Sequence, residues 1–387
     1  MIKNILVISN HYPSPIYPVK GTFVYQLVKA FTRQGIKCTV INPIPITLKL
    51  LRNWSSAIVK LNEGITVLHP KYLSMSDKEF FKFNTYYLTK IFYQNAVKQS
   101  IKQLKEKPDI VYGHFLYPDG GVVIHLGKQF SVPSFVAVGE SSFWSIRPIG
   151  FDKASYEYRD VTGIIAVGNH IKKALTSKLK IPEEKIGVFP NATDLTIFYP
   201  RDRLQMRRKY RFPIDLTIIA FVGKFDERKG PHRVLEAIQP IPNTGAIFIG
   251  EGKIPIEGEK VLYKGTVPHM EIPQILSSAD IFVLPTLAEG SCNAIVEALA
   301  CGLPVITSKG EYNDNLVDEN VSMRVNPQNI EEIRAAIKWL IRHPEERQRL
   351  SQNALKRAKK YFDINLRAKK ILSWMERIIS QYKRSIK

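Results

Sequence analysis

Two glutamates, Glu289 and Glu297, stand with seven residues between them at a predicted turn from strand to helix. The apolar run 281–284 predicts a buried strand before the turn, residues 294–300 are helix formers, and residues 304–307 predict the next strand. A strand, helix and strand in this order make a parallel crossover unit, and such units bind ligands at the carboxyl ends of their strands. Glu289 is therefore expected at a ligand-binding edge of a sheet.

The chemistry expected of this turn is the binding of a sugar and a phosphate. The first N–H groups of the helix, near residues 290–293, have no partner within the helix, and the helix dipole favours a phosphate or a sugar oxygen there. An ionised glutamate only accepts hydrogen bonds, so each carboxylate suits the paired hydroxyls of a hexose or a ribose. Taken alone, the two glutamates are also consistent with a helix-capping carboxylate and a solvated helix face.

A second candidate site follows the apolar run 217–222, where Gly223 leads into a loop that carries Lys224 and Lys229. A diphosphate held without a metal ion needs cationic donors, which two lysines of one loop can supply. The sequence contains no Asp-x-Asp pair, which weakens the case for a metal-bridged diphosphate. A basic loop of this kind is also consistent with a merely solvated surface.

The chain has a strongly basic composition. It carries a formal net charge of +21 over 387 residues, and residues 1–100 hold 13 Lys and Arg against 3 Asp and Glu. Residues 49–54 and the stretch 80–107 mix basic and aromatic residues at helical spacing, which is typical of an interfacial helix on an anionic bilayer, where each basic residue adds roughly 1 kcal/mol. The same charge is consistent with nucleic-acid binding or with a lysine-rich soluble surface.

The sequence indicates a reducing compartment. The N-terminal run MIKNILVIS lacks the long apolar core of a signal peptide, and no uncharged apolar run reaches the length of a membrane span. The cysteines Cys38, Cys292 and Cys301 are odd in number and lack metal-ligand spacing, which fits reduced thiols. We therefore expect a cytoplasmic protein that is peripheral on the inner face of the cell membrane.

The length predicts two domains, and alternating strand and helix signals predict that each is α/β with a parallel sheet. Strands are predicted at residues 5–8, 38–41, 65–69, 108–112, 133–137, 163–167, 217–222, 246–250, 281–284 and 304–307. Helices are predicted at residues 22–34, 120–130, 231–238, 294–300, 330–340, 344–360 and 366–383. A basic, loop-like segment at 190–213 marks the boundary. We expect an N-terminal domain at 1–195, a C-terminal domain at 196–365 and a final helix at 366–387 that packs on the N-terminal domain.

Taken together, the motifs of the chain resemble the retaining glycosyltransferases of family 4, of the bacterial cell-surface polysaccharide type. The resemblance covers nearly the whole chain. Its motifs are the glycine loop SNHYPSPIYPVKGTFVYQLVKAF, PNATDLTIFYP (190–200), VGKFDERKG (222–230), IGEGK (249–253) and SADIFVLPTLAEGSCNAIVEALACGLPVITS (278–308). Their order and spacing are specific, and they favour a ligand-binding role for the two glutamates over a capping one.

The resemblance implies a role for each residue that matches the family motifs. Glu289 stands at the position of the glutamate that contacts the donor hexose, and Glu297 stands at the position of the glutamate that binds the ribose hydroxyls. Lys229 matches the lysine that binds the diphosphate. Lys224 stands where the family usually has arginine, which keeps the charge but loses the planar fork. The expected donor site also includes glycines of the loops and residues at the start of the helix. These are Gly21, Gly223, Gly250, Gly290, Ser291, Asn293 and Ala294.

Two positions depart from the family pattern. Many members carry a histidine near the reacting sugar after the strand at 133–137, but residues 138–143 contain none. Glu140 or Ser141 takes over its role, or His114 contributes, although His114 is equally consistent with a packed loop histidine. At residue 192 an alanine replaces the usual glycine of the linker motif, which could alter the hinge.

The fold implied by the resemblance is GT-B, with two Rossmann-like doubly wound domains and a cleft between them. The implied activity is hexosyl transfer (EC 2.4.1.-) from a UDP-linked donor with retention, without a metal or another cofactor, to a glycan or polyprenyl-linked acceptor at an anionic membrane surface. Two alternatives stay open. A sugar-nucleotide epimerase shares the fold and needs no acceptor, whereas a nucleic-acid-binding protein would have no use for the paired glutamates.

Overall fold

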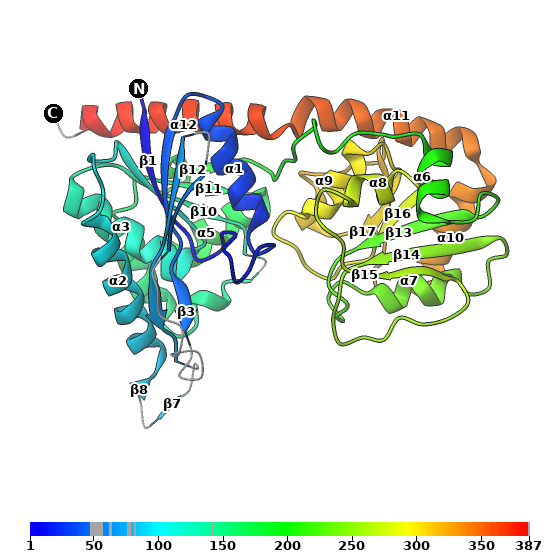
Figure 1. Cartoon of the computed structure of the whole chain (residues 1–387), viewed down its shortest axis with the longest axis horizontal. Coiled ribbons are helices and arrows are strands. Elements are labelled where there is room, and N and C mark those ends of the chain that lie inside the picture. The colour runs from blue at the N-terminus through cyan, green and yellow to red at the C-terminus, as the bar shows by residue number, and fades with distance from the viewer. Residues whose placement is uncertain (47–56, 62–63, 76–78, 81–82, 141, 386–387) are drawn as a thin grey trace. The chain divides into compact units, whose positions relative to one another are not determined.

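The computed structural model describes residues 1–46, 57–61, 64–75, 79–80, 83–140 and 142–385. The chain divides into two compact units, Met1–Phe189 with Ala368–Lys387, and Pro190–Arg367 (Figure 1). The passage from the first unit to the second at Pro190 falls before the boundary that we placed at residue 195. Each unit contains one large, mainly parallel sheet.

The first unit has an eight-stranded sheet in the order β12-β11-β10-β9-β1-β2-β5-β4, in which only the β4–β5 pair is antiparallel. Its strands are β1 (Asn4–Ile8), β2 (Lys37–Ile41), β4 (Ala57–Leu61), β5 (Ile65–His69), β9 (Ile110–His114), β10 (Ser134–Val138), β11 (Gly163–Ala166) and β12 (Ile186–Val188). Four shorter strands pair in two small sheets: β3 (Ile44–Ile46) with β6 (Lys71–Leu73), and β7 (Glu79–Phe80) with β8 (Phe83–Asn84). The helices are α1 (Thr22–Thr32), α2 (Tyr86–Ile101), α3 (Gly121–Phe130), α4 (Phe151–Tyr158) and α5 (Asn169–Leu179).

Helix α2 occupies most of the stretch 80–107, for which we predicted an interfacial helix. Its Tyr93 and Val97 are buried in the core of the first unit. The ammonium of Lys90 lies 3.0 Å from Glu157 Oε1, with only 15% of its side chain exposed. The prediction is therefore wrong for this face of the helix, because the mixed basic and aromatic pattern contains core residues. The other predicted interfacial segment, residues 49–54, lies outside the described residues.

Across the described ranges of the chain, no helix is both long enough and apolar enough to span a membrane.

The second unit has a six-stranded, fully parallel sheet in the order β15-β14-β13-β16-β17-β18. Its strands are β13 (Thr217–Val222), β14 (Thr244–Ile249), β15 (Val261–Gly265), β16 (Ile281–Leu284), β17 (Val305–Ser308) and β18 (Ser322–Val325). Its helices are α6 (Arg203–Tyr210), α7 (Pro231–Ile238), α8 (Ile272–Leu276), α9 (Asn293–Ala300), α10 (Ile330–Arg342), α11 (Pro344–Tyr361) and the start of α12 (Ile364–Ser385). Strands β13, β14, β16 and β17 are buried almost throughout, as expected of a parallel sheet with both faces covered.

The segment 190–213 is not the basic loop that we predicted, because residues 203–210 form helix α6. Asp202 caps this helix by accepting a hydrogen bond from the Gln205 N–H at 2.6 Å. Arg207 is only 3% exposed, and its Nη2 lies 2.5 Å from Asp280 Oδ2. The helix was missed because it lacks an apolar stripe and is instead attached to the core through a buried ion pair.

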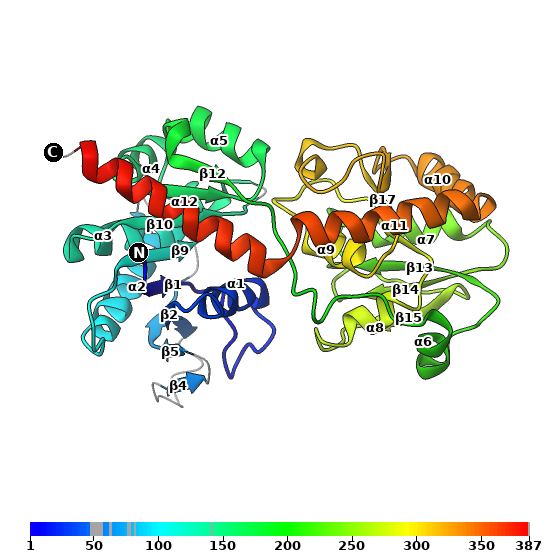
Figure 2. The ribbon, with the colours of Figure 1, turned by 90° about the horizontal axis from the view of Figure 1, so that it is seen from above.

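From Ala368 onward, helix α12 belongs to the first unit. The Trp374 ring packs edge-on against Phe135, with centroids 5.8 Å apart, and against Phe189 at 5.7 Å. The Ile2 N–H donates a hydrogen bond to Glu376 Oε1 at 3.0 Å. Figure 2 shows this part of the red helix running across the strands of the first sheet. These contacts attach the last helix to the start and to the end of the segment Met1–Phe189.

Candidate functional site

Each sheet has a switch point at which the chain changes from one side of the sheet to the other, between β13 and β16 in the second unit and between β1 and β9 in the first. At such a switch point the loops that follow two neighbouring strands lead away in opposite directions and leave room for a ligand at the carboxyl ends. Ala220 of β13 pairs with Phe282 of β16. The loops after these two strands, which carry Lys229 and Glu289, therefore begin next to each other at the carboxyl edge of the sheet.

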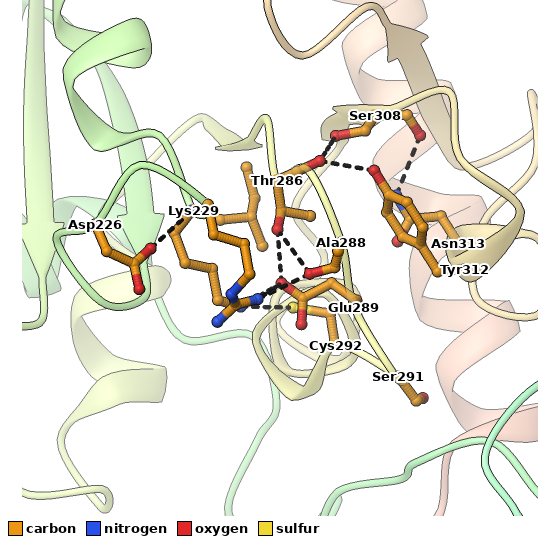
Figure 3. A network of polar contacts seen from close by, with 12 residues as sticks. Asp226, Lys229, Thr286, Ala288, Glu289, Ser291, Cys292, Ser308, Tyr312 and Asn313 are labelled. Carbon is orange, nitrogen blue, oxygen red and sulfur yellow. Dashed lines mark hydrogen bonds and ion pairs between the residues drawn. The ribbon is translucent and has the colours of Figure 1, made fainter. Parts of the chain in front are cut away.

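Glu289 lies between β16 and α9, and one of its oxygens is the centre of a polar network (Figure 3). Its Oε1 accepts hydrogen bonds from Thr286 Oγ1 at 2.7 Å and from Arg228 Nη1 at 3.0 Å. Lys229 Nζ lies 2.6 Å from the same oxygen. Because only 10% of the Glu289 side chain is exposed, these donors are what stabilise its charge away from water.

Lys229 is held from both ends. Its backbone N–H donates to Asp226 Oδ1 at 2.8 Å, and its Nζ lies 3.8 Å from the sulfur of Cys292. Burial acts to lower the pKa of Lys229, but Cys292 and the Glu289 carboxylate outweigh it, so the pKa is raised. The side chain is therefore a fixed, protonated cation next to the start of α9.

Further hydrogen bonds fix the loop that carries Glu289 (Figure 3). The Thr286 carbonyl accepts from Ser308 Oγ at 2.5 Å and from the Tyr312 hydroxyl at 2.7 Å. Asn313 Nδ2 donates to the Ser308 carbonyl at 3.1 Å. Because Ser308 ends β17 and Tyr312 lies in the following turn, the Glu289 loop is attached to the next strand of the sheet.

The start of α9 contains four of the predicted donor-site residues, Gly290, Ser291, Asn293 and Ala294. Ser291 is used inside the protein, since its Oγ accepts from the Asn191 N–H at 3.0 Å and its carbonyl accepts from Asn191 Nδ2 at 2.9 Å. Asn293 Oδ1 is buried and has no hydrogen-bond partner among the described residues. No side chain caps the helix. The turn therefore offers the Asn293 amide oxygen and the first N–H groups of α9, which have no partner within the helix.

Glu297 lies inside α9, with 10% of its side chain exposed, and it is paired with His269. The distance from His269 Nε2 to Glu297 Oε1 is 3.0 Å, and the imidazole lies against the Phe198 ring with centroids 5.1 Å apart. Burial acts to lower the pKa of His269, but the hydrogen bond and charge of Glu297 outweigh it and raise the pKa. The predicted ribose-binding carboxylate thus has a partner that sequence reasoning did not select.

Two predicted glycines bring the loops after β13 and β14 into contact. The Gly223 N–H donates to the Ile249 carbonyl at 3.0 Å, and Gly250 has a φ of +146°. A Cβ at Gly250 would lie 1.9 Å from the Gly223 carbonyl oxygen, so only glycine fits. Lys224 follows directly and has an exposed side chain. The two loop lysines therefore differ, because Lys229 is buried in an ion pair and Lys224 faces solvent.

In the first unit, Gly21 precedes α1 with a φ of +71°. A Cβ there would lie 2.1 Å from the His11 carbonyl oxygen, so the loop after β1 passes close to the helix start. The predicted glycine is thus required both by its backbone conformation and by this close approach.

Two of the three candidates for the role of the missing histidine lie among the described residues, and both are buried. His114 is the last residue of β9 and so does not lie in a loop, but it is packed as that alternative expected, with its ring against Phe23 at a centroid distance of 5.2 Å. Glu140 accepts hydrogen bonds from the Leu116 N–H at 3.0 Å and from Ser145 Oγ at 2.8 Å, and burial raises its pKa. A catalytic role for either residue stays a prediction, and Ser141 lies outside the described residues.

Asp119, which sequence reasoning did not select, lies at the switch point of the first sheet. It is fully buried, and its oxygens accept hydrogen bonds from the Asn10 N–H, at 3.1 Å to Oδ2, and from the Tyr93 hydroxyl. Burial raises its pKa to about 8, against the opposing effects of the Tyr93 and Asn10 hydrogen bonds. At neutral pH the carboxyl group therefore holds a proton.

Asp119→Asn is expected to remove a pH-dependent part of the stability. The folded protein keeps a proton on Asp119 that the unfolded chain, with a pKa near 3.8, releases. This contribution is complete below that pH and is lost as the pH rises to about 8. The free energy of unfolding of the wild type relative to the variant should fall by roughly 2–3 kcal/mol between about pH 5.5 and 8, measured by urea unfolding. Parallel pH profiles of the two proteins would contradict the buried, protonated state.

The structure thus joins Glu289 and Lys229 directly and places Gly290, Ser291, Asn293 and Ala294 in the same turn. Sequence reasoning missed several partners of the predicted site residues, among them Arg228, Thr286, Asn191 and, beside Glu297, His269. Arg228 stands next to Lys229 in a loop already selected, and a basic residue at that position was the available signal. The other three gave no local signal.

Comparisons with known proteins identify the family and the fold of the chain. The family model described as Glycosyltransferase Family 4 matches residues 21–197, and the model described as Glycosyl transferases group 1 matches residues 202–357. The putative teichuronic acid biosynthesis glycosyltransferase TuaC of Bacillus subtilis is 25% identical over 351 residues, which cover 86% of this chain and 88% of TuaC. Spore coat protein SA of the same organism is 24% identical over 83% of this chain and 91% of its own.

Solved structures show the same fold at lower identity. Sucrose-phosphate synthase from Thermosynechococcus elongatus superposes with a TM-score of 0.79 at 17% identity, covering 98% of this chain and all of that one. HepE of Anabaena in complex with UDP gives a TM-score of 0.73 at 16% identity, covering 97% of this chain and all of HepE. The chain is a glycosyltransferase that belongs to family 4 and has the GT-B fold of two Rossmann-like α/β domains.

Proposed function

We propose that the chain is a retaining hexosyltransferase (EC 2.4.1.-) that moves a hexosyl group from a UDP-linked sugar to a glycan or polyprenyl-linked acceptor in surface polysaccharide synthesis. The observation that carries this proposal is the buried pair of Lys229 and Glu289 beside the uncapped start of α9. A departing diphosphate needs a fixed cation and free N–H groups, and a bound hexose needs a carboxylate acceptor. All three stand at one edge of the second sheet.

The named relatives support the choice of donor and pathway. TuaC is described as acting in teichuronic acid biosynthesis, and HepE has been solved with UDP and with UDP-glucose. In this chain the corresponding donor would place its diphosphate near Lys229 and Lys224, its hexose near Glu289 and its ribose near Glu297.

The proposed mechanism depends on stabilising the leaving group. Lys229, Lys224 and the N–H groups at the start of α9 would stabilise charge as it develops on the departing diphosphate, with no metal or other cofactor. No side chain would form a covalent bond to the sugar. Because Lys229 already has a carboxylate partner at 2.6 Å, it would be held in place before the donor arrives.

A screen of UDP- and GDP-sugars for thermal stabilisation tests the donor. A ligand at 100 times its dissociation constant stabilises the folded state by roughly 2.7 kcal/mol, a clear shift of Tm. We expect UDP-sugars to stabilise the protein equally with and without EDTA. Stabilisation by GDP-sugars alone would contradict the proposed UDP-linked donor. Stabilisation that is lost in EDTA would contradict the proposed independence of metal ions.

The product distinguishes the remaining alternatives. Retention predicts that the new glycosidic bond keeps the anomeric configuration of the donor, which NMR of the product measures. Conversion of UDP-N-acetylglucosamine without any acceptor would favour a sugar-nucleotide epimerase, and a gel shift with nucleic acid at moderate salt would favour a nucleic-acid-binding protein.

We also propose that the protein is cytoplasmic and binds the anionic inner face of the cell membrane through its basic surface. Flotation with vesicles of phosphatidylglycerol and phosphatidylcholine at low salt tests this. The protein should float with the anionic vesicles and be released by salt. A protein that stays in the soluble fraction at low salt would point to a soluble acceptor.

A further inference from the structure

A cavity of about 330 Å³ opens at the carboxyl edge of the first sheet. It lies between the segment that follows β10 and helix α5, which follows the neighbouring parallel strand β11. Its volume is at the lower end of the range of small-molecule sites, about 300–1,000 Å³. Ligands of parallel α/β sheets bind at this edge, so the position suits a substrate rather than a structural void.

The polar lining of the cavity is cationic. Arg147 and Lys178 both contribute to it, both are exposed, and neither forms an ion pair within the described part of the chain. His170 also lines the cavity, in the first turn of α5, where no acidic residue precedes it in the helix. The only carboxyl group of the described lining is that of Glu140, which is buried and already accepts hydrogen bonds from the Leu116 N–H and Ser145 Oγ. The cavity therefore favours an anion.

Apart from Ser142, the rest of the lining is apolar. Phe143 lies under Lys178, with the ammonium 5.7 Å from the ring centroid, and Phe151 at the start of α4 is 39% exposed. Trp144, which follows Phe143, has 61% of its surface exposed. Exposed aromatic rings beside basic side chains are typical of surfaces that meet the interface of a bilayer. An anion site next to such rings fits a phosphate that carries an apolar chain.

We propose that this cavity binds the phosphate end of a lipid-linked acceptor, with Arg147 and Lys178 on the phosphate and Phe143 and Phe151 against the first part of the chain. The inference rests on the proposed function, because it names where one of the two proposed acceptor classes binds. It extends that function because it gives Arg147 and Lys178 a role in choosing the acceptor, and neither residue lies in a motif of the donor site.

The test is calorimetric binding of geranyl phosphate to the full chain, with geraniol and inorganic phosphate as separate probes. Geranyl phosphate should bind more tightly than either. The variant with Arg147→Ala and Lys178→Ala should lose about tenfold or more in affinity for geranyl phosphate, because it loses charge-assisted hydrogen bonds. The matched variant with Lys102→Ala and Lys107→Ala removes the same charge from exposed positions of the first unit outside the cavity and should bind like the wild type.

The outcomes are distinguishable. Equal loss of affinity in both double variants would show a general charge effect and overturn the site, as would unchanged binding in the Arg147 and Lys178 variant. Inorganic phosphate binding as tightly as geranyl phosphate would overturn the lipid-linked acceptor. Thermal stabilisation by the sugar nucleotide that the screen identifies serves as the folding control for both variants. If no UDP-sugar stabilised the wild type, that result would contradict the proposed donor function rather than this cavity.

Discussion

Replacing Glu289 with glutamine is expected to lower kcat/KM by about 10- to 150-fold, because hydrogen bonds to a charged group contribute about 1.5–3 kcal/mol. The variant keeps the shape of the side chain but loses the charge that Lys229 contacts at 2.6 Å and Arg228 at 3.0 Å. The measurement is steady-state transfer with the donor identified by the sugar-nucleotide screen. The exposed Glu236 of α7 provides the control, since Glu236→Gln should leave kcat/KM unchanged.

Glu289→Ala should also destabilise the second unit. It leaves Lys229, whose side chain is 12% exposed, without its carboxylate, and breaking a buried ion pair in this way costs about 3–5 kcal/mol. Adding Lys229→Met removes the stranded ammonium, so the double variant should recover most of its thermal stability but none of its transfer activity. Wild-type kcat/KM in Glu289→Gln would exclude the sugar-contact role. A double variant as unstable as Glu289→Ala would show that the stranded charge is not the cause.

The fold could be predicted where a strand is a continuous apolar run or where a helix has a regular apolar face. Strands β13 and β16 and helix α7 have the bounds expected from the sequence, 217–222, 281–284 and 231–238. Elements whose stability comes from polar contacts left no such signal. Helix α6 depends on the Asp202 cap and on the buried pair of Arg207 and Asp280, which is joined only after folding.

The site could be predicted in its position but not in its partners. Glu289 was placed at a ligand-binding edge because a parallel crossover brings the end of each strand there. Its contact with Arg228, 61 residues earlier in the chain, requires that β13 and β16 be neighbours, and strand order is not written in either segment. The pairing of Glu297 with His269 could not be predicted either. Glu297 lies in α9, and His269 lies 28 residues earlier, in the loop between β15 and α8.

Among the glycine-to-alanine substitutions of the second unit, Gly250→Ala is expected to lower the free energy of unfolding the most. Its φ of +146° is nearly restricted to glycine and costs an L-residue about 1–3 kcal/mol. The new Cβ would also meet the backbone oxygen of Gly223 at 1.9 Å, and overpacking of this kind costs a further ~1–3 kcal/mol. Because this oxygen belongs to the loop that leads to Lys229, the variant should bind UDP-sugars weakly even where it remains folded.

Gly258→Ala separates the two causes. Gly258 has a similar φ of +139°, but the nearest atom to a new Cβ is Nε2 of Gln239 at 3.4 Å, the end of a flexible side chain. This variant should therefore lose only the conformational part, about 1–3 kcal/mol, and keep its thermal response to UDP-sugars. If calorimetry gave the two variants the same Tm, the contact between the loops after β13 and β14 would not be the constraint. A Tm for Gly250→Ala well below that of Gly258→Ala would instead identify that contact as what holds the loop of Lys224 and Lys229 in place.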